Sequence, residues 1–260
     1  MKYNYHTHTY RCRHAIGKDR DYVEAAIDAG IEILGFSDHS PYIFPKEAGS
    51  YYSGHRMRPE ELEGYVESIE SLKEEFKGKI RIFKGVEIEY YPKCFSETEK
   101  FLSDAGIEYL ILGMHTFGNE FDSGSFYVAG PNGASKDQFE SYMSLVVECI
   151  ESKKFLYVAH PDIFYFDGDR EFYKKQVERV AVAAKKNNVP LEANMLGFRG
   201  RRHYPTKDFW EVVREVGAPA IFGVDAHDPA ALKDADNAIR DFKNEFNVEG
   251  INFIEDEPLL

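Results

Sequence analysis

Short apolar runs alternate along the chain with longer segments in which apolar residues recur at helical spacing. Seven runs have the length and composition of strands, at residues 3–8, 32–37, 80–88, 108–114, 155–159, 189–194 and 219–225. Between them, apolar residues return every three or four positions, which predicts amphipathic helices over about 62–76, 139–150 and 232–246. A further helix from about Asp21 is expected to end at Gly30, because glycine commonly caps helix C-termini.

This alternation predicts an α/β fold, with parallel strands joined by right-handed crossovers. Seven strands are one fewer than in the eight-stranded barrel, so a TIM-like seven-stranded (β/α)7 barrel is the leading fold, and an open doubly wound sheet is the alternative. No repeat or linker divides the chain, which favours a single domain over 1–260. Two connections, about 40–58 and 116–135, are longer than a compact domain needs, and such loops are often functional.

The composition of the chain limits its possible binding partners and indicates its cellular compartment. The 260 residues include 45 acidic and 32 basic side chains, a formal net charge of −13 that gives no general attraction for nucleic acid or anionic membranes. The first residues lack the apolar stretch of a secretory signal, and no apolar run is long enough to span a bilayer. Three widely spaced cysteines make a disulfide framework improbable and favour a cytoplasmic protein.

The placement of histidine and acidic residues is the strongest functional signal in the chain. Seven histidines and two carboxylates lie at or just after the ends of successive predicted strands: His6, His8, His14, His39, Glu87, His115, His160, Asp225 and His227. In a barrel, the C-terminal strand ends surround one mouth, so these side chains would face a single bowl. A catalytic zinc-type ion takes three or four protein ligands, so nine indicate two or three ions, and imidazole with carboxylate suits zinc, manganese or iron.

In this order and spacing, the nine residues resemble the ligands of the polymerase-and-histidinol-phosphatase (PHP) superfamily, over nearly the whole chain. The resemblance implies a distorted seven-stranded barrel that holds three divalent metal ions. It also implies a first metal on His6, His8, Glu87 and Asp225, a second on Glu87, His115 and His160, and a third on His14, His39 and His227.

Such a cluster predicts phosphoester hydrolysis. Adjacent divalent ions lower the pKa of a shared water, and the resulting bridging hydroxide can attack phosphorus while the ions hold the other phosphate oxygens. No Gly-x-Ser-x-Gly elbow or P-loop offers a competing chemistry. We expect Glu87 and Asp225 to hold the reacting centre, and Asp38, beside His39, to orient an imidazole.

Positive and planar side chains near the mouth are candidates for substrate contacts. The segment Asn194-x-x-Gly197-x-Arg199 resembles the stretch after the sixth strand of histidinol phosphatases, which makes Arg199 the first candidate for phosphate. Arg11, Arg201, Arg202, Phe117 and His203 are further candidate contacts.

The resemblance favours L-histidinol phosphate as the substrate, in histidine biosynthesis. The segment after His160 has no arginine before Arg170, and this departure keeps another small phosphate ester, or a phosphotyrosyl protein, as an alternative. A polymerase-associated nuclease would be expected to carry a basic stripe, and a two-metal amidohydrolase has no use for His14, His39 and His227. A metal store without enzymatic activity would not need every ligand of a hydrolytic cluster. The expected partner is a small phosphorylated molecule, without nucleic acid or membrane, and the oligomeric state stays open.

Overall fold

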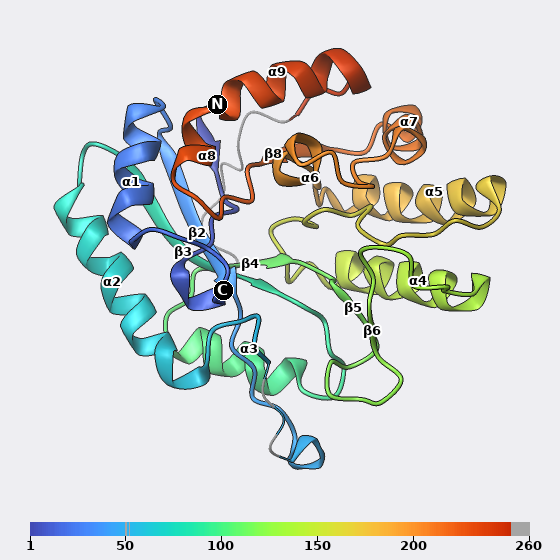
Figure 1. Cartoon of the computed structure of the whole chain (residues 1–260), viewed down its shortest axis with the longest axis horizontal. Helices are drawn as coiled ribbons and strands as arrows, with labels where there is room; N and C mark the ends of the chain where they lie inside the picture. The colour runs from blue at the N-terminus through green and yellow to red at the C-terminus, as the bar shows by residue number, and fades with distance from the viewer. Residues whose placement is uncertain (50, 52, 251–260) are drawn as a thin grey trace.

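The computed structural model describes residues 1–49, 51 and 53–250, in which parallel strands curl around a common axis (Figure 1). Two residues of the predicted 40–58 loop and the last ten of the predicted 1–260 domain lie outside this description. Four strands lie side by side in chain order: β1 (Tyr3–Asn4), β2 (Ile33–His39), β3 (Arg81–Ile88) and β4 (Tyr109–Leu112). Two more form a parallel pair, β7 (Leu191–Asn194) and β8 (Ala220–Gly223).

Single parallel bridges link the four-stranded sheet to this pair on both sides. Val158 pairs with Leu112 of β4 and with Leu191 of β7, and Thr7 pairs with Ala226, three residues beyond β8. The predicted strand at 155–159 is therefore reduced to one bridging residue. Pro190, opposite it, has no N–H to donate, and His160 ends the extended segment with a φ of 28°. The result is an α/β fold with a curled parallel half-barrel, which confirms the predicted class and only part of the predicted barrel.

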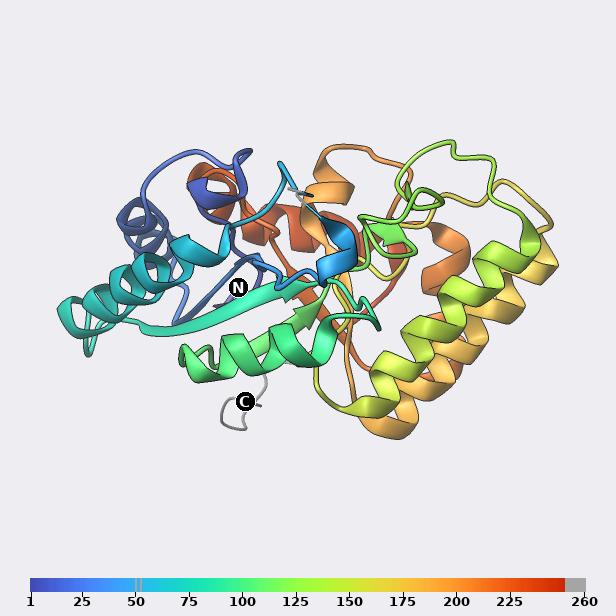
Figure 2. The ribbon, with the colours of Figure 1, turned by 90° about the horizontal axis from the view of Figure 1, so that it is seen from below.

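Helices cover the outside of this curled sheet, and in Figure 2 two of them, α4 and α5, run along each other at one end of the molecule. The α-helices are α1 (Asp19–Asp28), α2 (Leu62–Glu75), α3 (Phe95–Asp104), α4 (Lys136–Ser152), α5 (Arg170–Asn187), α6 (Met195–Arg199), α7 (Lys207–Val216), α8 (Ala230–Lys233) and α9 (Ala235–Phe246). Short 3₁₀ turns are η1 (Tyr10–Cys12), η2 (Lys46–Ala48) and η3 (Pro59–Glu61). Within the described residues, no helix has the length and apolar character needed to cross a bilayer.

The helices expected from the apolar pattern are present, with two adjustments. Gly30 follows α1 with a φ of 71°, and α2 buries Leu62, Tyr65, Ile69 and Leu72 as the pattern predicts. The helix predicted over 232–246 is divided at Asp234 into α8 and α9. The segment 116–135, expected to be a loop, contains a small hairpin of β5 (Thr116–Phe117) and β6 (Phe126–Tyr127).

The inner face of the curled sheet changes from apolar to ionisable along the strands. In β3, Phe83, Gly85 and Glu87 share that face, because alternate residues of a strand point the same way. Phe83 packs against a buried cluster drawn from several strands and from the bridging segment, namely Tyr3, Tyr5, Ile33, Tyr109, Ile111, Leu156, Tyr157, Ala159 and Ile221. Apolar side chains thus fill the amino end of the half-barrel, and Glu87 lies at its carboxyl end.

Tyr109 ties this inner cluster together. Its one hydroxyl proton is shared between the carbonyl oxygens of Tyr5, at 2.9 Å, and Phe36, at 2.8 Å, which lie on neighbouring segments of the sheet. Its ring occupies the space above two glycines: a Cβ on Gly85 would lie 2.3 Å from a ring carbon, and one on Gly35 would lie 2.2 Å from the hydroxyl oxygen. The absence of a side chain at both glycines is therefore a packing requirement.

We predict that Gly85→Ala destabilises the protein by about 1–3 kcal/mol, since the added methyl group overpacks the Tyr109 ring. Gly64→Ala is the matched control, because Gly64 lies in α2 and a Cβ added there would meet nothing within 4 Å, so it should stabilise the helix by about 0.5 kcal/mol. Urea unfolding of both variants measures the two changes. Equal stability of the two variants would contradict this account of the inner core.

Candidate metal centre

A cavity of about 690 Å³ opens at the carboxyl ends of the strands. Its lining includes eight ionisable residues of the predicted ligand set, namely His8, His14, His39, Glu87, His115, His160, Asp225 and His227. His6, the ninth, is fully buried beneath them. The structure thus brings together all nine residues that the strand-end pattern selected.

Glu87 lies at the centre of this arrangement and is 1% exposed. Its Oε1 is 2.7 Å from His160 Nε2 and 3.5 Å from His115 Nε2. Its Oε2 is 3.1 Å from His39 Nδ1, a neighbour that the register of β2 and β3 places directly beside it. Gly113 makes room for the carboxylate, since a Cβ there would lie 2.1 Å from Oε1.

Asp225 forms a second centre of negative charge. Its Oδ1 lies 3.1 Å from His8 Nε2, 3.2 Å from His227 Nδ1 and 3.5 Å from His6 Nε2. The residue has a φ of 53°, in the left-handed region that an aspartate adopts only at a cost of about 1–3 kcal/mol. Backbone bonds on either side hold this conformation: Val224 N–H donates to Asn4 Oδ1, and Ala226 N–H donates to the His6 carbonyl.

The side chains group into sets whose donor atoms lie within 4.8 Å of one another, close enough to share an ion. Four sets contain only predicted ligands and together include all nine: His6–His8–Glu87, His6–His160–Asp225, His39–Glu87–His115 and His14–His39–His227. Imidazole nitrogens and carboxylate oxygens are the donors that zinc, manganese and iron accept.

Buried atoms without partners fit metal binding. Glu87 Oε2 and Asp225 Oδ1 are both inaccessible to solvent, and neither makes a hydrogen bond within the described part of the chain. An uncompensated buried carboxylate oxygen is costly, and a cation offsets that cost. The residues present therefore fit divalent ions.

A comparison with protein-family models matches residues 4–195 to the PHP domain. This match spans most of the chain. The chain belongs to the PHP domain family. The resemblance inferred from the strand-end histidines is confirmed.

Individual relatives agree with the family match. A probable histidinol-phosphatase of Deinococcus radiodurans is 30% identical over 247 residues, which cover 91% of this chain and 92% of the relative. The histidinol-phosphatase of Bacillus subtilis is 24% identical, covering 85% of this chain and 92% of its own. Among solved structures, a histidinol phosphate phosphatase of Lactococcus lactis, in complex with zinc, L-histidinol and phosphate, has a TM-score of 0.67 at 21% identity and covers 92% of this chain and 93% of its own. A putative histidinol phosphatase of Listeria monocytogenes has a TM-score of 0.73 at 19% identity, and the match covers 88% of this chain and 97% of the other.

In this PHP domain, a second layer of carboxylates lies behind the histidines. Glu192 Oε1 accepts from His6 Nδ1 at 2.7 Å, and its Oε2 accepts from His160 N–H at 2.9 Å. Glu89 Oε1 accepts from His115 Nδ1 at 3.1 Å. Neither glutamate was among the residues predicted from the sequence, although Glu192 is in the predicted sixth strand and Glu89 comes two residues after Glu87. Such partners fix the orientation of metal-binding imidazoles.

Asp38 also belongs to this layer, and the imidazole that it faces is that of His8. Its Oδ1 lies 3.5 Å from His8 Nδ1, and its Oδ2 accepts from the Thr9 hydroxyl. From its chain neighbour His39 it accepts a hydrogen bond only from the backbone N–H, at 2.8 Å. Successive residues of β2 point to opposite faces, so Asp38 cannot follow the His39 side chain.

Of the predicted substrate contacts, the structure places only Arg202 in the cavity lining, where its Nη1 donates to the Tyr204 hydroxyl at 3.0 Å. Five others lie outside the lining formed by the described residues: Arg11, Phe117, Arg199, Arg201 and His203.

Four of these five are engaged elsewhere, which corrects the expectation that they face the cavity. The buried Arg11 pairs with Asp19 at 2.9 Å, and Arg199 Nη1 donates to the Ala231 carbonyl at 3.1 Å. Phe117 stacks on Phe126, and His203 Nε2 donates to the Ile163 carbonyl at 2.7 Å. Arg201 is exposed at a turn with a φ of 47°.

Arg56 is a cationic residue of the lining that the sequence pattern did not select. It comes from the long loop after β2, and its Nη2 lies 2.5 Å from Glu120 Oε2 and 3.9 Å from Glu89 Oε1. Nothing in the sequence around it distinguishes it from a solvated loop arginine. Only the fold brings Glu120 from the 118–125 segment to its side.

Protonation of His6 and His8 opposes metal binding, because the pKa values of both imidazoles are raised. Burial alone would lower the pKa of His6, but Glu192, Asp225 and Glu87 outweigh it and raise the pKa to about 10. Burial likewise disfavours the charged form of His8, yet Asp225 and Asp38 raise its pKa well above the ordinary value. His6 is therefore an imidazolium at neutral pH in the metal-free protein, the pKa of His8 is shifted in the same direction, and an ion has to displace the extra proton.

We predict that Glu192→Gln lowers the affinity for the ion bound by His6 about 10–100-fold. A glutamine has one acceptor oxygen, whereas Glu192 accepts from His6, His160 and Asn194 together. Competition with a chromophoric chelator measures the affinity. Glu178→Gln, at an exposed position of α5, is the matched control. Unchanged affinity in Glu192→Gln would refute the role assigned to this carboxylate.

We also predict that metal binding near neutral pH releases protons, because His6 and His8 must lose theirs. The affinity should rise as the pH increases from 7 towards 10, the range in which His6 deprotonates. Titration calorimetry in two buffers of different ionisation enthalpy counts the protons. His203→Gln, outside the cluster, should leave the count unchanged, and zero release by the parent protein would contradict the assignment.

Proposed function

We propose that the protein is a metal-dependent phosphomonoesterase that hydrolyses L-histidinol phosphate to L-histidinol and phosphate. The observation that carries the proposal is the convergence of seven histidines and two carboxylates on one cavity. Membership of the PHP domain family and the near full-length relative in Deinococcus radiodurans support the reaction. The Lactococcus lactis structure, which contains zinc, L-histidinol and phosphate, supports the choice of substrate.

We infer three divalent ions, of zinc, manganese or iron. His6, His8, Glu87 and Asp225 would hold the first. Glu87 with His115 and His160 would hold the second, and His14, His39 and His227 the third. When bound, such ions would neutralise phosphate charge and lower the pKa of a water molecule towards neutrality.

Other residues of the chain orient the imidazoles and would contact the phosphate group. Glu192 and Glu89 hold the imidazoles of His6 and His115 in place from behind, and Asp38 lies 3.5 Å behind the His8 ring. Arg202 lines the cavity near Asp225, where its guanidinium can donate to the non-bridging oxygens of a phosphate group. Tyr204, 2% exposed, accepts a hydrogen bond from that guanidinium through its hydroxyl oxygen.

Three further features belong to this proposal. The bridges at Val158 and Thr7 support a distorted seven-stranded barrel closed around the site. A single domain over 1–260, acting on a small phosphorylated molecule rather than on nucleic acid or membranes, is consistent with the acidic net charge. A cytoplasmic location stays a prediction.

The proposal predicts that protein with verified metal content hydrolyses L-histidinol phosphate with a kcat/KM well above that for p-nitrophenyl phosphate and phosphotyrosyl peptides. A value no better than for generic esters would reject histidinol phosphate as the substrate. Absence of phosphate release from every ester, with zinc or manganese bound, would reject the phosphatase itself.

The role of Arg202 predicts that Arg202→Met lowers kcat/KM for histidinol phosphate about 10–100-fold through lost contacts to the phosphate. Arg201→Met is the matched control, because the neighbouring guanidinium is exposed and outside the cavity lining. A loss confined to Arg201→Met, or equal losses in both variants, would overturn the assignment.

A further inference from the structure

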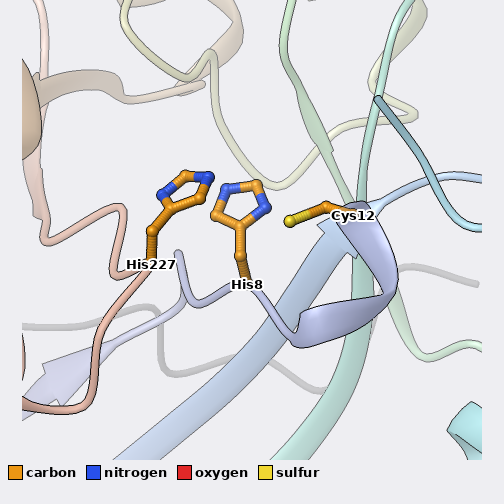
Figure 3. A group of neighbouring side chains, drawn as sticks. All are labelled: His8, Cys12 and His227. Carbon is orange, nitrogen blue, oxygen red and sulfur yellow. The ribbon is translucent and has the colours of Figure 1, made fainter. Parts of the chain in front are cut away.

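The cysteine of the first loop lies against the cluster of histidines, although it is none of the nine predicted ligands. Cys12 ends η1, between β1 and α1, and is fully buried with a free thiol. Its Sγ and one ring nitrogen each of His8 and His227 lie within 4.8 Å of one another. Figure 3 shows the three side chains in a row, with the sulfur beside His8 on the side opposite His227.

A second observation concerns the ring of His8 itself. The residue is fully buried, and its Nδ1 makes no hydrogen bond within the described residues, although Asp38 Oδ1 is 3.5 Å away. In Figure 3, the nitrogen nearest the sulfur belongs to this ring. A buried imidazole nitrogen and a thiol thus face each other at the edge of the histidine cluster.

The site can be reached from the cavity. His8 and His227 both line it, and the His227 side chain is 19% exposed. Zinc forms bonds of about 2.0–2.1 Å to imidazole nitrogen and about 2.3 Å to cysteine sulfur, lengths that span most of the separation between these donors. The His8 and His227 rings are stacked, with centroids 3.9 Å apart, so the His227 ring has to turn out of the stack before all three donors can reach one ion.

We propose that Cys12, His8 and His227 form a separate site for a thiophilic divalent ion such as zinc or cadmium. Binding there takes one sulfur and two imidazole nitrogens, and the thiol proton passes to the solvent together with the extra proton of a charged His8 ring. The site goes beyond the proposed phosphatase activity, because the nine predicted ligands do not include a cysteine.

This site competes with the catalytic arrangement for two side chains. A neutral imidazole offers one nitrogen to a metal. His227 therefore cannot bind an ion at Cys12 and also one shared with His14 and His39. Likewise, His8 cannot use the same nitrogen for an ion at Cys12 and for one shared with Asp225. Thiolate favours zinc and cadmium over manganese, which prefers oxygen ligands. Excess zinc or cadmium should therefore inhibit the enzyme, whereas excess manganese should not.

The test is a cadmium titration of the full chain, without substrate, followed by the ultraviolet absorption of a cadmium–thiolate bond. The parent protein should develop this absorption with one ion per chain, and manganese should produce none. Cys12→Ser should lose the absorption, while Cys149→Ser, which removes another buried thiol in α4, should keep it. Because the readout needs no substrate, failure of the phosphatase assay leaves it unaffected.

A second variant makes the test independent of any folding defect caused by changing Cys12. The double variant Cys94→Ala, Cys149→Ala keeps Cys12 as the sole thiol and should retain the full absorption. Loss of the absorption in this variant, its persistence in folded Cys12→Ser, or its absence from the parent protein would each overturn the proposal. Inhibition of the manganese-loaded enzyme by excess zinc should disappear in Cys12→Ser and persist in Cys149→Ser.

Discussion

Glu87 is a carboxylate buried to 1% exposure, and the arrangement around it is dictated by the cost of placing a charge there. Burial alone would raise its pKa, but the surrounding imidazoles, His115, His39 and His6 foremost, hold the pKa well below its ordinary value. The strand register, the missing side chain at Gly113 and the convergence of four chain segments all serve to bring those imidazoles within reach. Metal ions complete the compensation that the histidines begin.

The constraint extends outward in layers. Each imidazole that faces Glu87 or Asp225 needs a fixed ring orientation. Hydrogen bonds to Glu192 and Glu89 fix the rings of His6 and His115. Glu192 is itself fully buried, and a Cβ on Gly223 would lie 1.7 Å from its Oε1, so the neighbouring strand must carry glycine there. A single buried charge thus determines residue choice two layers away from the cavity.

Sequence reasoning selected the histidines and carboxylates that the fold brings together far better than it selected the arginine that lines the cavity. Histidines such as His115 and His160 follow successive apolar runs, and strand ends of a parallel sheet converge by geometry, so position along the chain was enough to select them. Arg199 ends α6 and Arg202 follows three residues later, and only the three-dimensional path of this segment separates the arginine bonded to Ala231 from the one in the cavity. The reduction of 155–159 to a bridge likewise depends on Pro190 and on the backbone of His160, whose φ of 28° no apolar pattern reveals.

The central claim is that Glu87 and Asp225 anchor a cluster of divalent ions at the base of the cavity. Anomalous diffraction from crystals of the metal-loaded protein, recorded at the absorption edges of zinc, iron and manganese, tests it most directly. The account predicts separate peaks in contact with Glu87 and with Asp225, and one among His14, His39 and His227. Peaks confined to other parts of the molecule, or none at Glu87 in protein with full metal content, would contradict it.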